Sequence, residues 1–115
     1  MAVAFRPGEV LELAFAVGSE EENGALNVWV SGEFDLAGIP CFMQELERVQ
    51  RHGRDIAVVD LAQLLFIDAV GLRALMAIRD RVSDGRPVPA LVGASPAVSR
   101  VFEMVGLEHH LMDGR

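Results

Sequence analysis

A short apolar run near the middle of the chain limits the fold more than any other feature of this sequence. Residues 55–61 read DIAVVDL, and a stretch with helical periodicity lies on each side of them. A continuous apolar run of this length is typical of a central strand covered on both faces. Strands that alternate with helices pair in parallel through right-handed crossovers. We therefore expect an α/β fold with residues 55–61 near its centre.

Two amphipathic helices flank this run. The first is Ile39–Arg51, where Pro40 fits the first turn. The second is Ala69–Val82, where the carboxylate of Asp68 can accept N–H groups of the first turn as an N-cap. The apolar stripe of the first helix consists of Ile39, Phe42, Met43, Leu46 and Val49.

The last third of the chain predicts one more strand and one more helix. Pro87–Val92 contains two prolines, which favour an edge strand. Ser95 and Pro96 then fit the N-cap and first position of a helix that Gly106 ends. The tail 107–115 has room for one more turn. The stripe of this third helix consists of Val98, Val101, Phe102 and Val105.

The first third predicts an antiparallel hairpin. Val10–Val17 and Ala25–Ser31 each place large apolar side chains on one face at a spacing of two, and Gly18–Gly24 joins them as a charged loop longer than two residues. The aligned residues are Leu11, Leu13, Phe15 and Val17 in the first strand and Leu26, Val28 and Val30 in the second. Whether Trp29 is covered or exposed stays open. The full order is β-β-α-β-α-β-α, a mixed β-sheet with helices packed on it. No repeat or linker divides the chain, so we expect a single domain over residues 1–115.

The scarcity of reactive side chains argues against an enzyme. All ten basic residues are Arg, and Lys, Thr and Tyr are absent. No phosphate-binding loop, Gly-rich dinucleotide motif or G-x-S-x-G motif is present. Cys41 has no disulfide partner, and His52, His109 and His110 lack metal-ligand spacing. We therefore expect no catalytic residues, no metal and no cofactor.

Charge and hydropathy also limit the partners. Residues 1–50 carry nine acidic and two basic residues, whereas residues 51–115 carry eight of each. An acidic surface repels phosphate backbones, so we expect no binding to nucleic acid. No apolar run approaches the roughly 18 residues needed to cross a bilayer, so we expect a cytoplasmic protein without membrane insertion. Whether the chain forms a homodimer stays open.

The segment LAQLLFIDAVGLRAL, residues 61–75, is the candidate binding site. Here we expect a buried strand to end at residue 61 and a capped helix to begin at the surface, with Ala69, Val70, Gly71 and Leu72 in its first turn. Small residues there allow a partner's backbone to approach closely, and the helix dipole makes the site sensitive to an added anion. The same residues also fit a plain helix start in which Gly71 allows close packing against the sheet.

Three motifs in this sequence resemble those of STAS domains, the anti-sigma factor antagonist family. DIAVVDL followed by LLFIDAVGLRAL resembles an apolar strand and the Asp-Ser-Ser/Ala/Thr-Gly-Leu start of a helix. VSGEFDLAG, residues 30–38, resembles the strand that ends in Gly-Glu-Leu-Asp, with Phe34 where Leu is usual. ASPAVSRVFEMVGLEHHL, residues 94–111, resembles the Ser-Pro-x-Val motif. The resemblance covers about residues 9–112.

The resemblance implies a partner-switching module. In this family an antagonist binds an anti-sigma factor that is also a serine kinase, and phosphorylation of the Ser after the motif Asp weakens that binding. Carried over by motif, the partner-binding residues are Glu33, Asp35, Asp68, Ala69, Val70, Gly71 and Leu72.

This sequence departs from the family pattern at the phosphoacceptor. Position 69 is Ala and position 70 is Val, and neither side chain can accept phosphate. The resemblance therefore implies an antagonist that binds its partner but is not phosphorylated at the usual site. The alternative is a STAS module of a lipid-transport complex, or a scaffold, that has lost partner switching.

Overall fold

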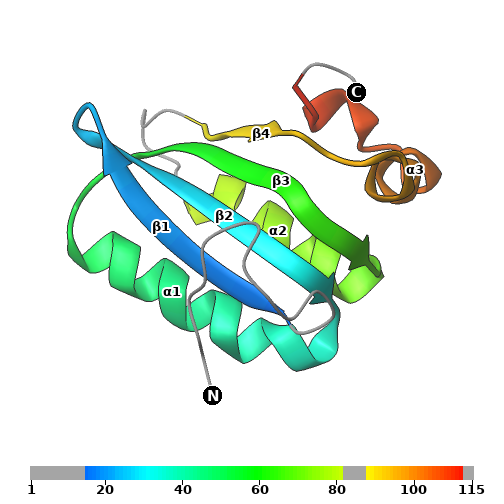
Figure 1. The fold of residues 1–115 in the computed structure, drawn as a ribbon, viewed down its shortest axis with the longest axis horizontal. Coiled ribbons are helices and arrows are strands. Elements are labelled where there is room, and N and C mark those ends of the chain that lie inside the picture. Colours follow the sequence, from blue (N-terminus) through cyan, green and yellow to red (C-terminus); the bar gives the residue numbers. More distant parts are fainter. Residues whose placement is uncertain (1–14, 82–87, 113–115) are drawn as a thin grey trace.

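The computed structural model describes residues 15–81 and 88–112 (Figure 1). Its four-stranded sheet has the order β1-β2-β3-β4, formed by Ala16–Glu22, Ala25–Phe34, Ile56–Ile67 and Ala90–Val92. β1 and β2 are antiparallel, and the other two pairs are parallel. The mixed sheet and the element order confirm the predicted α/β fold.

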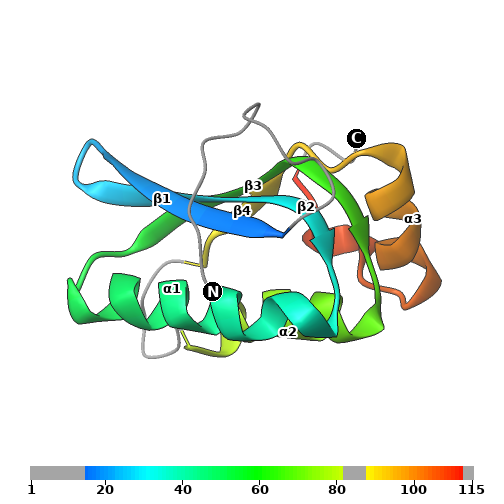
Figure 2. The same cartoon turned by 60° about the horizontal axis from the view of Figure 1, so that its bottom comes forward.

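The helices lie on one side of the sheet and at its β4 edge. α1 (Ile39–Arg51) and α2 (Ala69–Arg81) cover one face, and α3 (Pro96–Met104) packs beside β3 and β4 (Figure 2). The described residues also include two 3₁₀ turns: η1 (Leu36–Gly38) joins β2 to α1, and η2 (Glu108–His110) follows α3. The predicted bounds of α1 and the predicted start of α2 are confirmed.

The caps of α3 follow the prediction, but one residue of its stripe does not. Ser95 Oγ accepts a hydrogen bond from Val98 N at 3.2 Å. Gly106 adopts a φ of 77° just after the helix. Val98 and Phe102 are buried, whereas Val105 is half exposed. Val105 was wrongly assigned to the buried face because the helix ends at Met104, so the helical spacing no longer directs residue 105.

The hairpin differs from the prediction in its turn. Only Asn23 and Gly24 connect the strands, because Glu22 pairs directly with Ala25. Both connecting residues have positive φ, 55° and 85°, as a type I′ turn requires. The prediction of a long charged loop was therefore wrong. Glu20–Glu22 belong to β1, where exposed charges suit an edge strand. Residues 10–14 of the expected first strand lie outside the described residues.

β3 is longer and less covered than predicted. It continues to Ile67 because its last residue still pairs with Phe34 of β2. α1 and α2 cover only one of its faces, and Ala57, Ala62 and Gln63 on the other face are exposed. The prediction of a strand that ends at residue 61 and is covered on both faces was therefore wrong, although its central place in the sheet was right.

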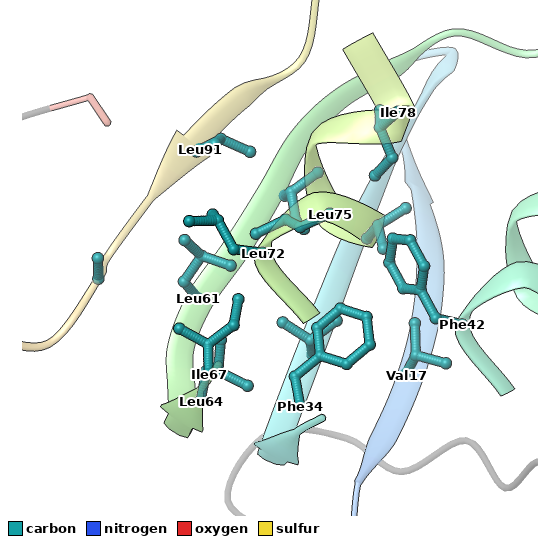
Figure 3. Close-up of a cluster of buried hydrophobic side chains, with 14 of the residues drawn as sticks. Val17, Phe34, Phe42, Leu61, Leu64, Ile67, Leu72, Leu75, Ile78 and Leu91 are labelled. Atoms are coloured by element: carbon teal, nitrogen blue, oxygen red, sulfur yellow. The ribbon is translucent and has the colours of Figure 1, made fainter. Parts of the chain in front are cut away.

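The core lies between the sheet and its helices (Figure 3). Phe34 at the end of β2 stacks on Phe15 with ring centroids 4.4 Å apart and lies 5.0 Å from Phe42 of α1. Trp29 points to the opposite face, yet only 7% of it is exposed. Its ring lies against Gly18 of β1, where a side chain would overlap it. The fully buried large side chains are Phe34, Phe42, Phe102, Leu61, Leu64, Ile67, Leu75, Ile78, Leu91, Val30, Val49 and Val59.

A hydrogen bond from α1 and an ion pair from the loop before β3 reach β1 at the hairpin end of the sheet. Arg48 Nη2 donates to Glu45 Oε2 at 2.6 Å and to Ser19 Oγ of β1 at 2.7 Å. The hydrogen bond from Arg48 to Glu45 raises the pKa of Arg48. Arg54 pairs with Glu21 of β1. Ser19, Glu21, Arg48 and Arg54 border a hollow of about 250 Å³.

Candidate functional site

The predicted site residues meet where β2 and β3 end and α2 begins. Asp68 N donates to the carbonyl oxygen of Phe34 at 3.3 Å, which joins the α2 start to the end of β2. Glu33 is the register partner of Phe66 in β3. Parallel strands place their carboxyl ends at one edge of the sheet, and that is why motifs 30 residues apart in sequence come together here.

Asp68 is the N-cap of α2, as predicted. Its Oδ1 accepts a hydrogen bond from Gly71 N at 2.8 Å, and its backbone oxygen accepts one from Leu72 N at 2.8 Å. A carboxylate at this position satisfies a free N–H group and interacts favourably with the helix dipole. Asp68 is half-buried.

Asp35 is the N-cap of η1. Its Oδ1 accepts a hydrogen bond from Ala37 N at 3.0 Å, and its backbone oxygen accepts one from Gly38 N at 3.0 Å. These bonds turn the chain from β2 into α1. Asp35 and Asp68 therefore each bond to the backbone of their own turn, rather than to a basic side chain.

The first turn of α2 divides into two exposed and two buried residues. Ala69 and Val70 are exposed, whereas Gly71 and Leu72 are buried. A Cβ at Gly71 would overlap the carbonyl oxygen of Phe34, so glycine is required for α2 to lie this close to β2. Leu72 belongs to the core. Of these four predicted residues, only Ala69 and Val70 offer side chains to a partner.

Two exposed apolar side chains on β3, Leu65 and Phe66, were not predicted as site residues. Gly32 pairs with Leu64 but Glu33 pairs with Phe66, so Leu65 is an extra residue that forms a β-bulge. Leu64, before the bulge, and Ile67, after it, are buried. Between them, Leu65 is 49% exposed and Phe66 is 47% exposed. The run LLFI could have indicated this exposure, because four consecutive apolar residues in a strand cannot all face one core.

Two further exposed apolar residues lie at this end of the sheet. Leu36 in η1 is 71% exposed, and Val70 in the first turn of α2 is 41% exposed. Leu36 was not among the predicted site residues. We call Leu36, Leu65, Phe66 and Val70 the strand-end cluster.

The arrangement favours binding over chemistry. Among residues 15–81 and 88–112, no group of three or more His, Cys, Asp or Glu residues could hold a metal ion. No helix within these ranges is long and apolar enough to cross a membrane. What this edge of the sheet does present is exposed apolar surface bordered by Glu33, Asp35 and Asp68, which suits contact with another protein.

Comparisons with known proteins identify the same fold. A family model described as "Mlab, STAS domain" matches residues 17–113. The crystal structure of an anti-sigma factor antagonist from Mycobacterium paratuberculosis is 26% identical, with a TM-score of 0.75 over 86% of this chain and 84% of that chain. The anti-sigma factor antagonist SpoIIAA in its unphosphorylated form is 19% identical, with a TM-score of 0.68 over 86% of both chains. A comparison with the curated proteins finds no match.

Proposed function

This chain belongs to the STAS domain family, and on that premise we propose that it is a non-catalytic module that binds an anti-sigma factor of the serine-kinase type. The observation that carries the proposal is the likeness to the mycobacterial anti-sigma factor antagonist, which extends over 84% of that chain. The retained acidic positions Glu33, Asp35 and Asp68 at one edge of the sheet support it.

We also propose that phosphorylation does not control this binding at the usual position. Ala69 is the residue directly after the motif Asp68, and it is exposed in the first turn of α2. An alanine has the shape of an unphosphorylated serine without its hydroxyl. A phosphate there would add nearly two negative charges beside Asp68 and Asp35. Without an acceptor at position 69, neither this charge nor the bulk of a phosphate can be added there.

Binding is tested directly with the anti-sigma factors of the serine-kinase type encoded in the same genome. We expect at least one to form a complex at micromolar concentration in isothermal titration calorimetry, with or without nucleotide. The proposal is contradicted if no such protein gives a heat of binding in the titration and none shifts the elution peak of this chain in size-exclusion chromatography.

Phosphate transfer is tested with the same kinase and ATP. We expect no label on the wild type and label on Ala69→Ser, located by mass spectrometry of the peptide that contains residue 69. The matched control is Ala77→Ser in the same helix, which we expect to stay unlabelled. Label on Ser31 or another serine of the wild type shows that regulation acts elsewhere.

A second candidate function is a STAS module within a lipid-transport complex or a scaffold. Ala69 is the observation that favours it, because such a role requires no phosphate switch. Co-purification of the tagged chain with a transporter, and with no anti-sigma factor, supports this alternative.

A further inference from the structure

The four side chains of the strand-end cluster are large, apolar and between 41% and 71% exposed. Leu36, Phe66 and Val70 come from η1, β3 and α2, three segments that the fold brings to one edge of the sheet. None of them supports the core, which is filled by Phe34, Ile67 and residues further along the helices. Exposed apolar side chains gathered at one place mark an interaction surface.

The β-bulge at Leu65 in β3 exposes two of the four residues of this cluster, Leu65 and Phe66. In a regular strand, Leu65 and Phe66 would alternate, and one of them would enter the core. The extra residue at Leu65 instead leaves both exposed, because the register moves by one between Gly32 and Glu33 of β2. Bulges redirect side chains in this way near functional sites.

Acidic side chains border the cluster. Glu33 lies on the same sheet face as its register partner Phe66, and Asp35 and Asp68 cap the turns that carry Leu36 and Val70. Among the described residues, no basic side chain forms an ion pair with these three carboxylates. One turn beyond Ala69, Arg73 is exposed and supplies a single positive charge. The edge therefore keeps a negative charge of about two.

We infer that the occupant of the strand-end cluster is a partner protein that presents an apolar segment flanked by arginine or lysine residues. This inference rests on the proposed function and specifies the chemistry of the partner. A second copy of this chain fits less well, because a symmetric contact through the cluster would bring Glu33, Asp35 and Asp68 of both copies together. Like charges across an interface oppose association.

The test uses two substitutions at the cluster, each with a matched control elsewhere on the surface. Phe66→Ser removes an exposed apolar side chain, and its control is Met104→Ser, because Met104 in α3 is 76% exposed. Glu33→Arg reverses a charge, and its control is Glu47→Arg on the exposed face of α1. Circular dichroism and thermal melts of all four variants check that they fold.

With the anti-sigma factor that binds the wild type, we expect each cluster variant to weaken affinity about tenfold or more. Each control variant should stay within about twofold, the range of peripheral contacts. Raising NaCl from low to high concentration should weaken the wild-type complex and have less effect on Glu33→Arg, because salt screens exposed charges. Folded cluster variants with wild-type affinity overturn the inference and leave the proposed function intact.

A second probe separates this inference from the proposed function. A synthetic amphipathic helix of leucine and arginine, and its twin with glutamate for arginine, are titrated into the isotopically labelled protein. We expect the arginine peptide alone to shift amide resonances of residues 33–37 and 65–73. Shifts centred on Glu20–Glu22 of β1 overturn the inference. Peptide binding at the cluster combined with no anti-sigma factor complex supports the inference and contradicts the proposed function.

Discussion

The two ends of the sheet use charge in opposite ways. At the hairpin end, Arg54 pairs with Glu21 of β1, and Arg48 pairs with Glu45 inside α1 while it donates a hydrogen bond to Ser19 of β1. At the other end, acidic side chains cap the turns after β2 and β3 through backbone N–H groups and remain without a basic partner among the described residues. Arginine side chains thus pair with two of the acidic residues at the hairpin end, whereas the carboxylates beside the strand-end cluster bond only to backbone N–H groups among the described residues.

The ends also differ in how tightly they pack, and this difference gives the largest expected effect. Phe34 and Leu26 are both buried residues of β2, at its two ends, but Phe34 is fully covered, stacks on Phe15 and packs at a tilt against Phe42. We expect Phe34→Ala to lower the free energy of unfolding by about 4 kcal/mol and Leu26→Ala by about 2 kcal/mol. Urea denaturation measures both. Equal losses would contradict a tighter core at the site end.

Glycine serves a different purpose at each end, which gives an intermediate effect. Gly71 has a neighbouring carbonyl where its Cβ would lie, whereas Gly24 has open space but a φ of 85°. We expect Gly71→Ala to lower the free energy of unfolding by about 3 kcal/mol through overpacking, and Gly24→Ala by about 1 kcal/mol through backbone strain. Denaturant unfolding followed by circular dichroism ranks them. A larger loss for Gly24→Ala would show that backbone strain at the hairpin costs more than the overlap of a Cβ at Gly71 with Phe34.

The smallest expected effect concerns the charges themselves. Asp68→Ala removes a helix cap, so we expect a loss of about 1 kcal/mol in the free energy of unfolding. Arg54→Gln breaks an ion pair between largely exposed groups, so its loss should stay below about 0.5 kcal/mol. Thermal melts at low and high salt check both values. A larger loss for Arg54→Gln would show that the hairpin-end pairs carry more stability than their exposure suggests.

Local sequence signals predicted most of the fold. Helical spacing and Pro40 gave the bounds of α1, and Asp68 and Ser95 marked the starts of α2 and α3, because caps and apolar stripes act within a few residues. The hairpin turn was missed although Asn23-Gly24 is the usual pair for a two-residue turn. The adjacent glutamates were read as loop residues on their polarity, yet an edge strand tolerates them.

The candidate site was predicted in part. Motif residues Glu33, Asp35 and Asp68 were named from the sequence, and the fold brings them to one edge of the sheet. Leu36, Leu65 and Phe66 were missed because their exposure depends on the register between β2 and β3. Gly71 was named as a residue a partner could approach, or alternatively as a packing residue, and its contact with Phe34 gives it the packing role.

Residue identity and short-range spacing are enough to specify which segments become helices and strands and which residues cap them. Residue identity also settles that position 69 carries no hydroxyl. Only the tertiary structure decided that one face of β3 stays open and that a bulge exposes Leu65 and Phe66. It also decided which acidic side chains meet an arginine and which accept hydrogen bonds from the backbone of a turn. Such features arise from strand register and helix placement, which link residues far apart in the chain.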